Sequence, residues 1–295
     1  MKTPIFEGVA TALITPITES GIDYEAFGKL IDWQIDEGVN ALVICGTTGE
    51  SSTLTDEEHR EAIAYAVKRA AHRVPIIAGT GSNDTAYALS LTEFSCKAGV
   101  DGVLVVTPYY NKATQNGLVQ MFTKIADVSS VPVILYNVPS RTGVNIAPAT
   151  VKELSKHPNI SGIKEAGGNI SAVAEIAALC GDDINIYSGN DDQTVPIMSL
   201  GGKGCISVLS NVLPKKASEM CAKMLNGDYK GAAKMQLEYL PLINALFSEV
   251  NPIPVKAAMA AMGWCEDYLR LPLTPMEPAH REALFAEMRK AGINI

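Results

Sequence analysis

The chain has 295 residues, 47% of them hydrophobic, and a formal net charge of −8 at pH 7. This length suits two average domains or one large α/β barrel. The acidic balance argues against a nucleic-acid-binding surface and against an anionic membrane as partner. It says little about small anionic ligands, because these respond to local charge.

The six cysteines are far apart in the sequence, and most lie in apolar stretches. None forms a C-x-x-C pair, so the spacing favours reduced core thiols over a disulfide scaffold. The N-terminal stretch has an early proline and only a short apolar run, which is not typical of a secretory signal. No apolar run reaches the ~18 residues that a membrane helix needs. We therefore expect a cytoplasmic protein.

Short, continuously apolar segments rich in β-branched residues recur through the first 210 residues. Such segments are typical of parallel strands covered on both faces. They lie at residues 8–15, 40–50, 74–81, 101–110, 131–139, 159–166, 184–191 and 203–211.

Helical patterns separate these strands. Residues 23–37 carry an apolar stripe that stops at Gly38, and Thr55 and Glu58 have the spacing of a capping box at the start of the next helix. Less sharply bounded helices are expected over 84–98, 115–127, 148–156, 170–180, 192–200 and 215–226. Three more are expected in the C-terminal part, over 228–247, 254–263 and 277–291.

Eight β-then-α units predict a closed (β/α)8 TIM barrel. An open doubly wound sheet is the alternative, although that class usually has a Gly-rich nucleotide turn after its first strand. We expect a barrel domain over 1–226 and a C-terminal helical region over 227–295.

In such barrels the active site forms at the carboxyl ends of the strands. The side chains there include hydroxyls, tyrosines, one lysine and one arginine, but no histidine. A zinc site of a common kind is therefore not expected. A Mg²⁺ site is poorly supported, because the acidic candidates Glu50, Glu165 and Asp191 are scattered.

Lys164 ends the sixth strand, and it follows an apolar approach through Gly162 and Ile163. Burial disfavours the charged ammonium and favours the neutral, nucleophilic amine. A neutral amine can attack a ketone and form an iminium that stabilises a carbanion. This chemistry requires neither a metal nor an organic cofactor. The alternative for Lys164 is a solvated charge at the rim.

Tyr136, one strand away, is the candidate proton carrier for this chemistry, with Thr47 and Tyr110 as hydroxyl neighbours that relay the proton. By itself Tyr136 would more simply be a core tyrosine with a satisfied hydroxyl group. Arg141 follows the fifth strand and suits bidentate capture of a carboxylate, or else a surface salt bridge. The turn at 46–51 offers backbone N–H groups to an anion, although a tight turn also explains its glycines.

Six motifs, spread in order along nearly the whole chain, resemble the dihydrodipicolinate synthase family. This family belongs to the class I pyruvate aldolases, which also include N-acetylneuraminate lyase. The motifs are GTTGES (46–51), TPYYN (107–111), LYNVPSRTG (135–143), GIKEAGGN (162–169), SGNDD (188–192) and NPIPVK (251–256).

The resemblance implies condensation of pyruvate with L-aspartate 4-semialdehyde in the diaminopimelate route of lysine biosynthesis, by a homotetramer built from two tight dimers. It implies that Lys164 forms the pyruvate Schiff base and that Tyr136, Thr47 and Tyr110 form the proton relay, with Tyr110 reaching across a dimer interface. It also implies substrate-binding roles for Thr48, Arg141, Gly189 and Ile206. Thr48 would hold the pyruvate carboxylate, Arg141 would hold the semialdehyde carboxylate, and Ile206 would act through its carbonyl group.

The chain departs from the family at a site for the inhibitor lysine. Sensitive members often have a histidine where this chain has Asp56 and a glutamate where it has Tyr87, whereas Ser51, His59, Asn83 and Tyr109 fit the pattern. Without the glutamate carboxylate, the ammonium group of lysine loses a partner. We predict weak or absent inhibition by lysine.

Three other functions remain open on the residues alone. The nearest is a sibling aldolase that cleaves a keto-sugar acid such as N-acetylneuraminate, although such lyases usually have serine first in the hydroxyl pair at 47–48. The others are a phosphate-binding barrel isomerase that uses the charge of Lys164, and a binding barrel without catalysis.

Overall fold

The computed structural model describes residues 2–295, in which eight parallel strands close into a barrel in the order β1-β10-β9-β8-β7-β6-β5-β4. The pairing of β1 with both β10 and β4 confirms the predicted (β/α)8 barrel and shows that the open-sheet alternative is wrong. The strands are β1 (Gly8–Ala12), β4 (Ala41–Ile44), β5 (Ile76–Gly79), β6 (Gly102–Val106), β7 (Val133–Asn137), β8 (Ile160–Glu165), β9 (Asn185–Ser188) and β10 (Gly204–Ser207).

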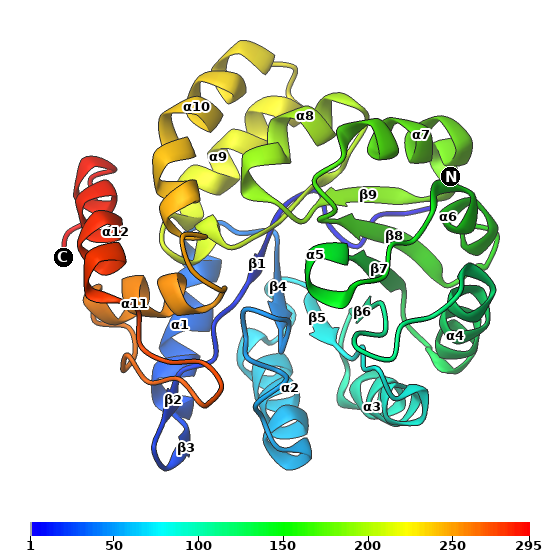
Figure 1. Ribbon diagram of the computed structural model, residues 1–295, viewed down its shortest axis with the longest axis horizontal. Helices are drawn as coiled ribbons and strands as arrows, with labels where there is room; N and C mark the ends of the chain where they lie inside the picture. The colour runs from blue at the N-terminus through cyan, green and yellow to red at the C-terminus, as the bar shows by residue number, and fades with distance from the viewer. Residues whose placement is uncertain (1) are drawn as a thin grey trace.

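Helices surround the ring of strands, as Figure 1 shows. α2 begins with the predicted capping box, in which Thr55 and Glu58 each accept from the other's backbone N–H. α1 ends at Asp36, just before Gly38, which has a φ of 85°. The surrounding helices are α1 (Tyr24–Asp36), α2 (Asp56–Ala70), α3 (Thr85–Ala98), α4 (Gln115–Val128), α6 (Pro148–Leu154), α7 (Ile170–Cys180), α8 (Thr194–Ser199) and α9 (Pro214–Leu225).

A few short elements were not predicted. A two-residue hairpin, β2 (Ile17–Thr18) with β3 (Gly21–Ile22), follows the first strand, and α5 (Pro139–Thr142) follows β7. Elements of two to four residues are too short to show a hydrophobic period, so sequence patterns do not detect them.

Side chains on the strands alternate between two apolar layers. In β7, Val133 and Leu135 face the surrounding helices, whereas Ile134 and Tyr136 face the barrel interior. The same two-residue period places Ile163 of β8 toward the helices and therefore turns Lys164 inward. Inside the barrel, Phe6 stacks on Tyr187 with ring centroids 4.4 Å apart.

The C-terminal helices pack against the barrel. α10 (Tyr229–Ala245) contacts α8 and α9, and α11 (Ile253–Ala261) and α12 (Pro278–Lys290) follow it. In Figure 1, α12 lies at the outer edge of the molecule and α11 lies closer to α1. Within residues 2–295, no helix is both long enough and apolar enough to cross a membrane.

All six cysteines are free thiols. Four of them, Cys45, Cys180, Cys205 and Cys221, are buried, in agreement with the predicted core thiols.

Candidate active site

Lys164 lies inside the mouth of the barrel and is only 6% exposed. It is the register partner of Tyr136 on the neighbouring strand, and its Nζ lies 4.3 Å from the centroid of the Tyr136 ring. Among the described residues, no carboxylate lies within ion-pair distance of this amine. The structure thus brings together the lysine and the tyrosine that the sequence singled out.

One glycine makes room beside this lysine, and another, on the same strand as the lysine, makes room for the ring of Tyr187. A Cβ atom on Gly189 would lie 3.0 Å from Lys164 Cε and 2.7 Å from the Cβ of Ala166. A Cβ atom on Gly162 would lie 3.1 Å from the ring of Tyr187. Any side chain at Gly189 would therefore displace the amine that the site presents.

A cavity of about 150 Å³ contains the lysine amine. Five of the predicted site residues line it, together with residues from the C-terminal region. The lining includes Thr48, Tyr136, Arg141, Lys164, Gly189, Asn190, Phe247 and Asn251.

Thr47 lines a neighbouring cavity of about 260 Å³ rather than the one that holds Lys164. Val138 and Arg141 line both cavities, which are therefore adjacent. Ser51, His59, Tyr87 and Tyr109 also line this larger cavity. Burial lowers the pKa of His59, whose ring Nε2 lies 2.9 Å from the carbonyl of Gly79.

Tyr110 is not brought to either cavity within one chain. It follows β6 on the surface, is 91% exposed and has a φ of 68°, a conformation that is uncommon for a non-glycine residue. Ile206 is fully buried on β10, with its side chain among the apolar residues of the barrel interior. The residue-based expectation that Tyr110 neighbours Tyr136 does not hold within a single subunit.

The segment 45–55, which we call the threonine loop, carries Thr47 and Thr48. Its turns are closed by backbone hydrogen bonds from Gly49 to Gly46 and from Glu50 to Thr47. Asn251 Nδ2 donates to Thr48 Oγ1 over 3.0 Å. Because the Thr48 oxygen accepts this bond, its own proton is free to be donated to a ligand.

Arg141 lies on α5 and reaches the same asparagine. Its Nη2 donates to the carbonyl of Asn251 over 3.3 Å. One residue of the C-terminal region therefore contacts both predicted carboxylate-binding side chains, Thr48 and Arg141.

Buried carboxylates hold the other strand ends in place. Glu165 accepts from Asn137 Nδ2 and from the backbone of Gly167, and burial raises its pKa. Asp191 accepts from Ser207 Oγ and from the backbone N–H groups of Val208 and Leu209, and burial raises its pKa as well. Neither carboxylate needs a metal ion to satisfy it.

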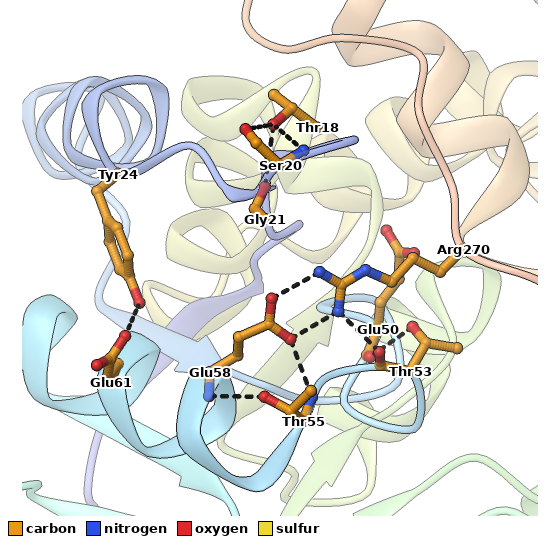
Figure 2. Close-up of polar contacts among 10 residues, drawn as sticks. All are labelled: Thr18, Ser20, Gly21, Tyr24, Glu50, Thr53, Thr55, Glu58, Glu61 and Arg270. Atoms are coloured by element: carbon orange, nitrogen blue, oxygen red, sulfur yellow. Dashed lines mark hydrogen bonds and ion pairs between the residues drawn. The ribbon is translucent and has the colours of Figure 1, made fainter.

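Sequence reasoning missed the contribution of the C-terminal region. Lys256 on α11 lies 2.7 Å from Glu50 in an ion pair whose two side chains are fully buried. Arg270 binds both carboxylate oxygens of Glu58 and the carbonyl of Thr53, as Figure 2 shows. A signal for Lys256 was present, because it is a lysine in the apolar segment IPVKAAMAA. Asn251 opens the family motif NPIPVK (251–256), but nothing in that motif showed that it contacts Thr48, and no local pattern pointed to Arg270.

Comparison with known proteins places this geometry in a family. A model of the dihydrodipicolinate synthetase family matches residues 5–291. The 4-hydroxy-tetrahydrodipicolinate synthase of a Thermoanaerobacter species is 53% identical over 291 residues, which are 98% of each chain.

Solved structures agree with this match. Dihydrodipicolinate synthase from Aquifex aeolicus superposes with a TM-score of 0.96 at 45% identity, covering 98% of this chain and 99% of the other. The chloride-inhibited dihydrodipicolinate synthase from Acinetobacter baumannii, solved in complex with pyruvate, gives a TM-score of 0.96 at 42% identity over 98% and 99% of the two chains. With its barrel, buried lysine and facing tyrosine, the chain belongs to the dihydrodipicolinate synthetase family.

Proposed function

We propose that Lys164 forms a Schiff base with pyruvate, through which this lyase acts as a 4-hydroxy-tetrahydrodipicolinate synthase. The observation that carries the proposal is the buried amine, which faces Tyr136 in a small cavity and has no carboxylate partner among the described residues. The amine attacks C2 of pyruvate, and loss of water from the carbinolamine gives the imine. Removal of a proton from C3 then gives an enamine, which is the carbon nucleophile.

The enamine adds to the aldehyde carbon of L-aspartate 4-semialdehyde and forms a carbon–carbon bond. The amino group of the semialdehyde then attacks the imine carbon, closes the ring and releases Lys164 as the free amine. No reductant or oxidant is needed, since the carbon–carbon bond forms by addition and the other steps exchange one amine for another or transfer water and protons. The product enters the diaminopimelate route of lysine biosynthesis.

Tyr136 is the proposed proton carrier for these steps, because its ring centroid lies 4.3 Å from Lys164 Nζ. Thr47 and Tyr110 complete the relay. Since Tyr110 is almost fully exposed in its own chain, the proposal requires it to enter the site of a neighbouring subunit. The assembly is a homotetramer made of two tight dimers, and we place it in the cytoplasm.

Two sets of groups hold the substrate carboxylates in this proposal. Thr48 donates its hydroxyl proton to the pyruvate carboxylate, since Asn251 already occupies the hydroxyl oxygen. Arg141 binds the carboxylate of the semialdehyde at the mouth. Gly189 leaves space beside the amine, and the carbonyl of Ile206 faces the bound substrate.

Trapping of the imine tests the proposal. The protein is incubated with pyruvate, reduced with borohydride and weighed intact, and the modified peptide is then mapped. A pyruvate-derived adduct on Lys164 is expected. A folded protein that stays unmodified would refute Schiff-base chemistry and every aldolase function.

Turnover with aspartate semialdehyde, compared with N-acetylmannosamine, separates the synthase from a sugar-acid lyase. The comparisons favour the synthase, and Thr47 at the first position of the hydroxyl pair agrees with it. Turnover with N-acetylmannosamine alone would reverse this assignment.

A further inference from the structure

The ion pair between Glu50 and Lys256 has no role in the chemistry described so far. The Lys256 ammonium lies 2.7 Å from Glu50 Oε1, and both side chains are fully buried. Neither carboxylate oxygen has a well-aligned hydrogen-bond donor among residues 2–295, so the contact is an ion pair with little other support. Such a pair is seldom a net source of stability, because removing two charges from water offsets much of their attraction. Stability alone therefore does not explain why the Glu50–Lys256 ion pair is buried here.

Glu50 lies within the threonine loop, two residues after Thr48. Its backbone N–H donates to the carbonyl of Thr47 over 3.1 Å, and its own carbonyl accepts from Thr53. Glu50 has a φ of 57°, in the left-handed region that favours glycine. The backbone at Glu50 is thus held in an unfavourable conformation directly beside the two threonines.

Lys256 ties this loop to a second segment. Its Nζ also donates to the carbonyl of Thr15 over 2.6 Å, and Thr15 Oγ1 donates to the carbonyl of Gly49 over 2.8 Å. One ammonium group therefore links α11, the segment after β1 and the threonine loop. The same C-terminal segment supplies Asn251, which contacts Thr48 directly.

We propose that Glu50 and Lys256 are positioning residues, which hold Thr47 and Thr48 in the geometry that binds the pyruvate carboxylate and relays protons. The ion pair keeps the loop in its left-handed turn, and through that turn it fixes the direction of the Thr48 hydroxyl. The inference rests on the proposed Schiff-base function, because Thr48 and Thr47 have these roles only in that reaction.

The test uses Glu50→Gln, Lys256→Met and the double variant Glu50→Gln/Lys256→Met in the full-length protein. Each single variant is expected to raise the KM for pyruvate about tenfold, the effect of weakening one hydrogen bond to a charged group. The rate of borohydride-trapped adduct formation at low pyruvate should fall by a similar factor. The KM for aspartate semialdehyde should stay within about twofold, because Arg141 lies on α5 outside this loop.

The double variant separates positioning from stability. It removes both buried charges and should recover most of the melting temperature that a single variant loses. We expect it to keep the raised pyruvate KM. Return of this KM to the wild-type value in the double variant would overturn the proposal and leave the pair a structural role only. If the single variants do not fold, the pyruvate KM of the double variant is compared directly with that of the wild type.

Two further measurements test whether the Glu50–Lys256 ion pair acts through Thr48 and whether a general loss of stability explains the effect. In a Thr48→Val background, Glu50→Gln should change the pyruvate KM by less than about twofold, because residues that act as a unit are not additive. Independent, multiplicative effects would contradict a route through Thr48.

Leu284→Ala, in the core at α12, serves as the matched control, since the cavity it leaves should lower the melting temperature without touching the loop. Its pyruvate KM should be unchanged.

Adduct formation by the wild-type protein distinguishes failure of the Schiff-base proposal from failure of the positioning proposal. If wild-type protein forms no adduct with pyruvate, the proposed function fails. If it forms the adduct and the variants match it in KM and trapping rate, only the positioning role fails.

Discussion

Among residues 2–295, two lysines are buried, and they are accommodated in different ways. Lys256 faces Glu50 and a backbone carbonyl, so its charge is matched within the protein. Lys164 faces the ring of Tyr136 and a cavity instead. A lysine with a carboxylate partner is engaged in an ion pair, whereas one that lines a cavity without such a partner is open to a ligand. This difference in environment separates Lys256, the proposed positioning residue, from Lys164, the proposed Schiff-base residue.

Substitution of Gly189 tests how closely the site fits Lys164. In Gly189→Ala the new methyl group would lie 3.0 Å from Lys164 Cε, so the amine must move. We expect formation of the trapped pyruvate adduct to slow by about tenfold or more, since small misplacements of reacting groups are costly. Gly117→Ala, on a helix with no contact closer than 3.4 Å, is the control and should react normally. Equal adduct rates in the two variants would contradict this close fit.

The larger cavity bears on inhibition by lysine. Asp56 is paired with Arg60, whose guanidinium lowers the pKa of this carboxyl group. Burial, with help from the nearby Asp56, raises the pKa of Tyr87 to about 12, so this side chain is neutral. The cavity therefore lacks a free carboxylate at either position where the family pattern differs.

We accordingly expect little inhibition of the wild-type enzyme by lysine in a coupled assay. Tyr87→Glu adds a carboxylate that can pair with an ammonium group and should increase inhibition. Clear inhibition of the wild type at sub-millimolar lysine would refute the prediction.

Arg270 links the threonine loop to the start of α2, because it donates to the carbonyl of Thr53 and to the carboxylate of Glu58. Hydrogen bonds from Arg270 and the N-terminal turn of the helix lower the pKa of Glu58 to about 2 (Figure 2). Because this folded-state pKa lies below the unfolded value of ~4.3, the stabilisation is fully present above about pH 5. It is lost as the pH falls from there toward 2.

Arg270→Gln should therefore lower the free energy of unfolding by roughly 1–2 kcal/mol at pH 7, allowing for the partial exposure of the pair. The difference between wild type and variant should shrink in urea unfolding measurements as the pH approaches 2. Lys29→Gln breaks an exposed pair with Glu25 and serves as the control, with no measurable effect expected. A pH-independent difference for Arg270→Gln would show that the contact does not act through the charge of Glu58.

The sequence predicted the barrel strands and the longer helices, including the three C-terminal ones, and missed the shortest elements and the long-range contacts. The strands and surrounding helices show clear periods, and Thr55 with Glu58 marked the start of α2 correctly. Lys164 and Tyr136 could be placed because parallel strands end at the same edge of a barrel. The contact of Asn251 with Thr48 could not be predicted, although Asn251 lies in a quoted motif, because it joins positions 203 residues apart.

For the whole molecule, the exposed Tyr110 predicts that a complete site needs two subunits. Lys164→Ala and Tyr110→Phe should each be nearly inactive alone. When the two variants are mixed under conditions that exchange subunits, activity should return, because a Tyr110→Phe subunit keeps its lysine and receives a tyrosine from its partner. A mixture no more active than its components would show that Tyr110 acts within its own chain. Sedimentation of the wild type tests the tetramer directly.

The contacts between the C-terminal segment and the barrel affect when the site can form during synthesis of the chain. The hydrogen bond from Lys256 to Thr15 joins residues 241 positions apart. Asn251 donates to Thr48, which follows β4. Contacts so distant in sequence form only after the intervening chain is available to fold. A ribosome must therefore release nearly the whole polypeptide before Thr48 acquires its partner. Unfinished chains would contain Lys164 but lack the Asn251 contact to Thr48, so the proposed carboxylate site would form only after synthesis of the C-terminal segment.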